Sequence, residues 1–219
     1  YKEMDQLSDM QKAIFKRGTD VGKLAQQFYP NGIDASPKTQ FEYEKAIKLT
    51  KELLEKKQKV IYEASLSFSD VLSVADIVVN EKSGLKVFEV KSSTSISETY
   101  IRDAALQYWV ISNCGYKIKD FSITYINNQY IRKGKLDINE LFVTESVLKL
   151  ILPLQKWVEE NVNQFKKVLA KKAIPKMDIG EHCYDPYTCG FYEYCRKHIP
   201  DNSIFDLSGI HLNKKYDLY

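Results

Sequence analysis

The sequence predicts an α/β fold in which helices flank a central mixed β-sheet. Two segments near the N-terminus carry apolar residues at helical spacing, and three strand-like runs then follow in close succession. A further helix precedes a fourth strand, and a long helix comes after it. The short links between the first three strands indicate hairpins, so we expect a mixed sheet with a helix on each face.

Two helices open the chain. Residues 8–30 have helical apolar spacing, and this segment is expected to end at Tyr29 and Pro30, because proline disfavours continuation of a helix. Residues 31–38 are punctuated by Gly, Asn, Ser and Pro and are predicted to form a loop. Residues 41–57 are predicted to form an amphipathic helix whose inward face carries Ala46, Ile47, Leu49, Leu53 and Leu54.

The period of the apolar residues then changes to that of β-strands. Strands are predicted over residues 59–68, 71–80 and 85–93, with turn residues between them. Residues 97–116 return to helical spacing, and 119–127 again have strand character.

The last part of the chain is predicted to be helical and then irregular. QYIRK (129–133) is expected to continue the fourth strand briefly, and one long helix is expected over 143–173, kinked at Pro153. A segment rich in Pro, Gly, Tyr and Cys follows. We therefore expect a core domain over 1–173 and a small cysteine-rich segment with a tail over 174–219.

Composition bounds the class of protein. Apolar content of 44% and charged content of 28% are typical of a soluble globular chain, and the charge excess of 32 − 29 = 3 does not by itself predict nucleic-acid binding. No run of 18 or more apolar residues occurs, so we expect no membrane span. Four cysteines without a signal peptide favour a reducing compartment, and we expect a cytoplasmic protein. Because the chain starts at Tyr1, we also expect a fragment whose natural N-terminus lies upstream.

Acidic residues fall on three successive predicted strands, as Glu63, Asp76 and Glu89. Lys91 shares a strand face with Glu89, and two ionisable groups on one face of a core strand need a partner, a bound ion or a function. An E-x-K pair alone is more often a surface salt bridge. Carboxylates that converge from neighbouring strands, however, form an oxygen-rich site suited to Mg2+ or Mn2+. We therefore predict a divalent-metal phosphodiesterase site.

The spacing Asp76, twelve residues, Glu89-Val90-Lys91 resembles the PD-(D/E)XK nuclease signature. More narrowly, the chain resembles the RecB-like branch that contains CRISPR-associated iron–sulfur exonucleases, and an uncharacterised bacterial family close to them. The resemblance spans nearly the whole chain and is carried by RGTDVGKLA (17–25), YEAS (62–65), VAD (74–76), EVKSST (89–94), DAALQ (103–107) and CYDPYTCGFYEYC (183–195). It implies a restriction-endonuclease-like core.

The resemblance also implies roles for individual residues. The metal would be held by Glu63, Asp76, Glu89 and the carbonyl of Val90. Lys91 would orient or activate the attacking water, and Gln107 matches the glutamine of the branch's fourth motif. Many relatives also have an N-terminal histidine near the metal, whereas all three histidines of this chain lie after residue 180. Arg102 and Asp103 are expected to be ordinary helix charges, although Asp103 lies one turn from Gln107 and could share its face.

The activity that the resemblance implies is a divalent-metal-dependent deoxyribonuclease. It would act on single-stranded DNA or DNA ends, in DNA repair or CRISPR-related processing, with DNA-processing proteins as possible partners. The alternative is an inactive nucleic-acid-binding or interaction module on a nuclease fold.

Cys183, Cys189 and Cys195 fall within thirteen residues and indicate one shared metal centre. The related nucleases hold an iron–sulfur cluster, commonly 4Fe–4S, with three C-terminal cysteines and one N-terminal cysteine. The fourth ligand here would lie upstream of Tyr1, or would be Cys114. A zinc site completed by His182 or His198 is the alternative, and a zinc-stabilised structural protein is a third reading of the chain.

GTDVGK (18–23) resembles a phosphate-binding loop but is rejected as one. Its spacing is G-x3-G-K, Leu24 replaces the Ser or Thr of that motif, and a helical pattern surrounds it.

Overall fold

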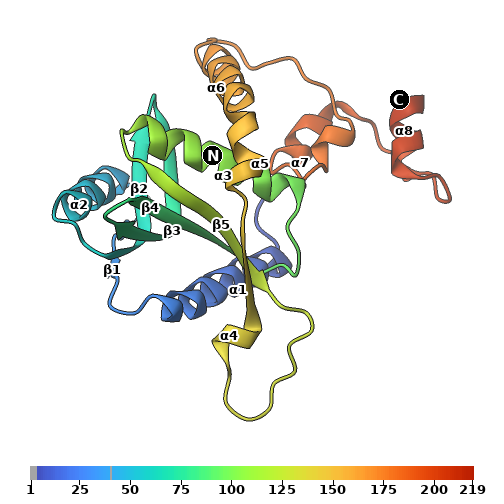
Figure 1. Ribbon diagram of the computed structural model, residues 1–219. Coiled ribbons are helices and arrows are strands. Elements are labelled where there is room, and N and C mark those ends of the chain that lie inside the picture. Colours follow the sequence, from blue (N-terminus) through green and yellow to red (C-terminus); the bar gives the residue numbers. More distant parts are fainter. Residues whose placement is uncertain (1–3, 40) are drawn as a thin grey trace. The chain divides into compact units, whose positions relative to one another are not determined.

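The computed structural model describes residues 4–39 and 41–219 (Figure 1). The chain falls into two units, one made of residues 14–167 and the other of residues 1–13 together with 168–219. None of the described helices is long and apolar enough to cross a membrane.

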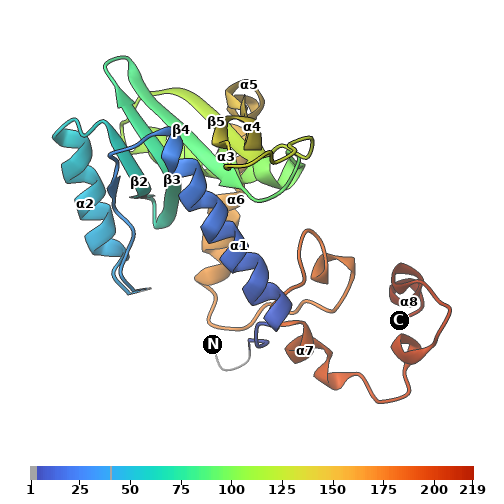
Figure 2. The ribbon, with the colours of Figure 1, turned by 90° about the horizontal axis from the view of Figure 1, so that it is seen from below.

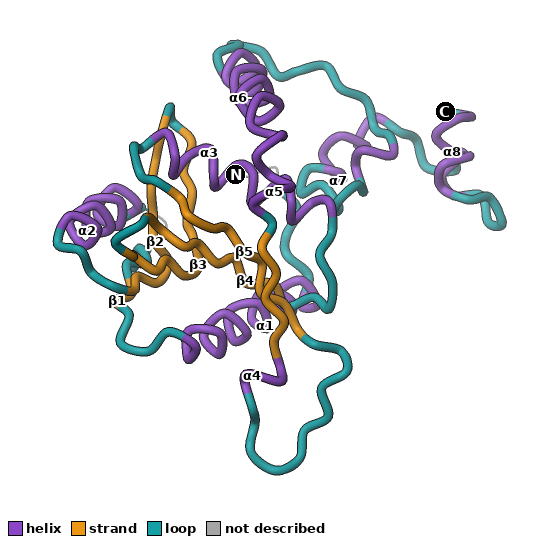
Figure 3. The backbone as a smooth tube through the Cα atoms, viewed as in Figure 1, coloured by secondary structure: helices purple, strands orange, loops and turns teal. Residues whose placement is uncertain are grey.

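The first unit is built on a six-stranded sheet whose strands follow one another in chain order (Figure 3). β2 pairs antiparallel with β3, β3 with β4, and β5 with β6, whereas β1 pairs parallel with β2 and β4 with β5. The strands are β1 (Ile33–Asp34), β2 (Val60–Phe68), β3 (Val71–Glu81), β4 (Gly84–Lys91), β5 (Ile118–Ile126) and β6 (Phe142–Ser146).

One face of the sheet is covered by the N-terminal helix. α1 (Asp9–Ala25) continues into the 3-10 helix η1 (Gln26–Phe28), and Figure 2 shows α1 in front of the strands. The apolar contacts on this face join Val21, Leu24, Ala25 and Phe28 of the helices to Val60, Tyr62, Ile77, Val79 and Phe88 of the strands. Burial of this apolar stripe holds α1 against the sheet.

The other face is covered by α2 (Tyr43–Glu55), α3 (Glu98–Asn113), α5 (Leu148–Ile151) and α6 (Gln155–Leu169). α3 is the crossover between β4 and β5 and begins after Ser97, whose side chain accepts a hydrogen bond from the backbone N–H of Tyr100. Ala104 and Ala105 of α3 are fully buried. These small residues let the helix lie close to the strands, which brings its neighbouring polar residues to the end of β4.

The predicted α/β class, a mixed sheet flanked by helices, is confirmed. The single helix predicted over 143–173 is wrong, because residues 142–146 form β6 and a 3-10 turn, η2 (Leu152–Leu154), separates α5 from α6. Val143 and Thr144 favour a strand, and Pro153 cannot donate the hydrogen bond that one continuous helix needs. The strand continuation predicted over 129–133 is also wrong, since none of those residues is in a strand.

The second unit holds the cysteine-rich segment and consists of short helical turns. They are η3 (Glu181–Cys183), α7 (Tyr192–Cys195), η4 (Arg196–His198), η5 (Ile204–Asp206) and α8 (Leu212–Leu218). Its small core is formed by Ile179, Cys183 and Tyr192. The backbone N–H of Asp5 donates to the carbonyl of Gly190 at 2.6 Å, so the N-terminal residues of the chain belong to this unit.

Candidate active site

The strands open where the acidic residues lie. The β2–β3 ladder pairs Tyr62 with Ile77 and Ala64 with Ala75 but omits the facing pair Glu63 and Asp76. Glu63 has φ 52°, in the left-handed region that a glutamate rarely adopts, which costs on the order of 1–3 kcal/mol. Such strain in the middle of a strand is typical of functional sites, where the rest of the fold imposes it.

The adjoining β3–β4 ladder ends at the pair Ile77 and Phe88. Asp76, the neighbour of Ile77 in β3, is therefore not part of the ladder. Beyond this point Oδ2 of Asp76 accepts a hydrogen bond from the backbone N–H of Val90 at 2.6 Å. A side chain thus takes the place of a ladder carbonyl, which keeps the buried N–H paired while the two strands separate.

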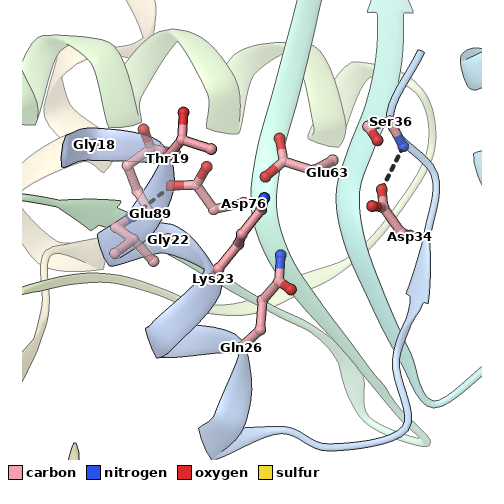
Figure 4. Close-up of a pocket in the computed structure, with 11 residues that line it drawn as sticks. Gly18, Thr19, Gly22, Lys23, Gln26, Asp34, Ser36, Glu63, Asp76 and Glu89 are labelled. Atoms are coloured by element: carbon pink, nitrogen blue, oxygen red, sulfur yellow. Dashed lines mark hydrogen bonds between the residues drawn. The ribbon is translucent and has the colours of Figure 1, made fainter. Parts of the chain in front are cut away.

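A cavity of about 420 Å³ lies at this opening, between the strands and α1 (Figure 4). Carboxylates from three neighbouring strands, Glu63, Asp76 and Glu89, line one side of it. The predicted convergence of these three residues is therefore present in the structure. Asp34, at the end of β1, also lines the cavity, and its carboxylate accepts a hydrogen bond from the backbone N–H of Ser36 at 2.8 Å.

Burial and mutual repulsion make these carboxylates reluctant to ionise. Burial raises the pKa of Glu63 to about 7, and the negative charges of Asp34 and Glu89 add to the rise. Burial also raises the pKa of Asp76, against the opposing hydrogen bond from Val90. The pKa of Glu89 is raised by burial first and then by Asp76. A bound cation is the simplest partner that would let all three carry their charge at neutral pH.

Lys91 lies beside these carboxylates in a four-residue network. Its Nζ donates to Oε1 of Glu89 at 2.7 Å and to Oδ2 of Asp103 at 2.7 Å. Nε2 of Gln107 donates to Oε2 of Glu89 at 2.8 Å and approaches Oδ1 of Asp103 at 3.5 Å. Lys91 and Gln107, both named from the sequence as site residues, thus both contact Glu89.

The same contacts decide what Lys91 can do. Although burial lowers the pKa of Lys91, the charges of Glu89 and Asp103 outweigh it and raise that pKa above its usual range. These two contacts favour the charged form of Lys91, and an ammonium suits the predicted role of orienting the attacking water and stabilising the developing negative charge.

Asp103 corrects the expectation that it is an ordinary helix charge. It is one of two carboxylates that share the ammonium of Lys91, and it comes from α3 rather than from a strand. The i, i+4 spacing of Asp103 and Gln107 was the sequence signal that pointed to a shared face. Arg102, by contrast, makes the expected surface pair with Glu98.

One polar atom of this network has no partner. Oε1 of Gln107 is buried and accepts no hydrogen bond from any described residue, whereas Nε2 of the same amide is engaged. An unpaired buried acceptor costs about 1–3 kcal/mol, so this oxygen can accept a hydrogen bond from water.

The donor set fits Mg2+ or Mn2+ in chemistry, because it consists of carboxylates, and Val90, whose carbonyl is the further predicted ligand, also lines the cavity. Within residues 4–39 and 41–219, however, no three Asp, Glu, His or Cys side chains stand close enough to hold one ion as they are placed. Both oxygens of Glu89 are engaged by Lys91 and Gln107. Binding a cation therefore requires Glu89 to exchange at least one of these contacts.

The three clustered cysteines lie together in the second unit. The backbone N–H of Cys189 donates to the carbonyl of Cys183 at 2.8 Å. The pKa of the Cys195 thiol is raised by burial first and then by Cys189, Cys183 and Asp5. All three are free thiols. Among the described residues they do not form a ready set of metal ligands either.

Cys114 is placed differently from these three. It belongs to the sheet unit, packs against the core there, and donates from Sγ to the carbonyl of Ser67 at 3.4 Å. That contact explains its position at the end of α3 without a metal.

No protein-family model and no curated protein matches this sequence. Among solved structures, the chain is similar to the alkaline exonuclease from Laribacter hongkongensis, with 9% identity, coverage of 78% of this chain and 91% of that one, and a TM-score of 0.29. It is also similar to the protein SSO0001, with 13% identity, coverage of 68% and 70%, and a TM-score of 0.27. TM-scores this low do not assign a function.

Proposed function

We propose that this chain is a divalent-metal-dependent deoxyribonuclease of the PD-(D/E)XK type, of the RecB-like branch. The observation that carries the proposal is the meeting of Glu63, Asp76 and Glu89 at one cavity, with the ammonium of Lys91 beside Glu89. The proposed substrate is DNA, as single strands or ends. The proposed setting is DNA repair or CRISPR-related processing in the cytoplasm.

The contacts of these residues and the resemblance to PD-(D/E)XK nucleases together support a proposed role for each of them. Glu63, Asp76, Glu89 and the Val90 carbonyl would hold Mg2+ or Mn2+, which when bound supplies positive charge to a phosphoryl oxygen and lowers the pKa of water. Lys91 stabilises the negative charge that develops on the phosphate and orients the attacking water. Gln107 fixes the orientation of Glu89, and Asp103 holds Lys91 in place.

The cysteines are proposed to hold a structural metal centre, separate in role from the hydrolytic site. A 4Fe–4S cluster bound by Cys183, Cys189 and Cys195 is the first candidate, and zinc completed by His182 or His198 is the second. The spacing of the three cysteines within thirteen residues, and the backbone hydrogen bond between Cys189 and Cys183, support a shared ligand set.

A digestion time course on end-labelled single- and double-stranded DNA tests the activity. We expect cleavage with Mg2+ or Mn2+, no cleavage with EDTA, and a loss of about a hundredfold or more in Lys91→Ala and Asp76→Asn. Cleavage that is indifferent to EDTA and to both substitutions would contradict the metal mechanism.

The engagement of both Glu89 oxygens by Lys91 and Gln107 favours a second candidate, a nucleic-acid-binding module without turnover. The same samples separate the two functions. Such a module would bind the labelled DNA and leave it intact at every metal concentration.

A further inference from the structure

The cavity has a second wall that the carboxylates do not explain. Residues of α1 line it opposite the strands, among them Gly18, Thr19, Gly22 and Lys23 (Figure 4). They belong to GTDVGK, the segment that resembles a phosphate-binding loop but is helical. We propose that this face of α1 binds the sugar–phosphate backbone of the substrate strand. Lys23 contacts a phosphate, and the two glycines leave room for the strand. The inference rests on the proposed function and adds the substrate-binding wall.

The two glycines are one helical turn apart, inside α1. Glycine destabilises a helix interior relative to alanine, so its presence there needs a reason. A Cβ added to Gly18 or Gly22 would meet no atom within 4 Å. Packing of the folded chain therefore does not require glycine at either position. The space in front of both belongs to the cavity, and a ligand that approaches the helix backbone closely would need it.

Lys23 is exposed, and it makes no ion pair with any described residue, although four carboxylates line the same cavity. Figure 4 shows its side chain extending from α1 toward the strands that carry Glu63 and Asp76. Lys91 is the opposite case, since two carboxylates hold its ammonium. Lys23 is thus a cation without an ion-pair partner among residues 4–39 and 41–219, and it lines the cavity of the proposed hydrolytic site.

The carboxylates alone would repel an anion, but with the proposed cation bound to them this side of the cavity would attract one. A phosphodiester could then be held from both sides, by the cation on one side and by the ammonium of Lys23 on the other. Gln26, one turn beyond Gly22, adds a side-chain amide that makes no hydrogen bond with a described residue. The wall reads phosphate rather than base identity, so binding should tolerate any sequence.

The test is DNA binding by fluorescence anisotropy, with Ca2+ in place of Mg2+, as a function of salt. Lys23→Ala should weaken binding of a labelled single strand about tenfold and reduce the slope of log K against log salt by about 0.7, the loss of one phosphate contact. Lys48→Ala makes the same change of charge on α2, which packs on the other face of the sheet, and should leave both values unchanged.

Substitutions of glycine test separately whether the substrate strand uses the space in front of the α1 glycines. Gly22→Ala should raise the melting temperature of the protein and yet weaken DNA binding, and Gly22→Leu should weaken binding further while the circular dichroism spectrum stays native. A fold defect would instead lower stability and binding together.

The outcomes separate this inference from the proposed function. If the wild type binds and cleaves DNA, but Lys23→Ala keeps the wild-type salt slope and Gly22→Leu binds normally, the inference is overturned and the nuclease proposal stands. If Lys23→Ala only changes the affinity for Ca2+, Lys23 is a counter-charge of the carboxylates and the inference is again overturned. A wild type that binds no DNA overturns both.

Discussion

At the scale of single residues, the ammonium of Lys91 is shared between Glu89 and Asp103. In the proposed mechanism Glu89 would turn to a cation, and Asp103 would then be the carboxylate that holds Lys91 near the phosphate. The sequence singled out Lys91 as a site residue, since two ionisable groups on one face of a core strand need a partner, a bound ion or a function. The role of Asp103 could not be predicted in this way, because contact between α3 and β4 depends on how closely two alanines let the helix approach the sheet.

Asp103→Asn should therefore lower kcat by about 10- to 100-fold and change KM little, since it removes one anchor of Lys91 and no proposed contact to DNA. Asp103→Glu should recover part of the loss. Steady-state kinetics measures both, with Arg102→Ala as the neighbouring surface control. An Asp103→Asn enzyme with wild-type kcat would contradict this role.

Glu63 gives a prediction about pH. Its folded-state pKa of about 7 lies above the ordinary value of 4.5, so its ionisation opposes folding. The contribution of Glu63 to the free energy of unfolding is fully present below about pH 4.5 and is lost as pH rises through 7. In EDTA, Glu63→Gln should flatten the fall in stability between pH 5 and 7, as measured by urea unfolding. A Glu63→Gln variant with the wild-type pH dependence would exclude Glu63 as the source.

At the scale of elements, the strands could be predicted because each carries its own signal. The predicted 59–68, 71–80 and 85–93 differ from β2, β3 and β4 by at most two residues at any end. Alternating apolar residues and short links fix these strands locally. The segment 143–173 could not be divided correctly, because apolar residues at helical spacing continue across β6, and pairing with β5 is a long-range contact.

The missing pair in the β2–β3 ladder could not be predicted either, because strand periodicity does not reveal a left-handed residue. It leads to a stability prediction for β2. Glu63→Gly should be more stable than Glu63→Gln by about 1 kcal/mol, since glycine adopts φ 52° without a steric penalty. Denaturant unfolding at one pH compares the two uncharged variants directly. Equal stabilities would show that the backbone at this residue carries no strain.

At the scale of the whole molecule, the proposed hydrolytic site and the proposed structural metal centre belong to different units of the chain. Residues 14–167 contain the carboxylates and both walls of the cavity, and the three clustered cysteines lie in the other unit. The sequence predicted the cysteine cluster as a compact segment. It did not predict that residues 1–13 join that segment, because the contact of Asp5 with Gly190 spans nearly the full chain.

Metal content tests the second unit. Wild-type protein purified without oxygen should contain iron and absorb as a brown cluster, or contain zinc and remain colourless. Cys195→Ser should lower the metal content and make residues 168–219 more susceptible to protease, whereas Cys114→Ser should change neither. Metal-free wild-type protein, or equal metal content in Cys195→Ser, would contradict a shared cysteine site.

The central claim is that side chains from β2, β3 and β4 together bind one hard cation. Titration of Mn2+ followed by electron paramagnetic resonance measures this binding without a substrate. We predict one tight Mn2+ per chain at pH 8 in the wild type, weakened at least about tenfold in Asp76→Asn and in Glu89→Gln, and retained in Lys48→Ala. Absence of tight binding in the wild type, or equal binding in all four proteins, would contradict the claim.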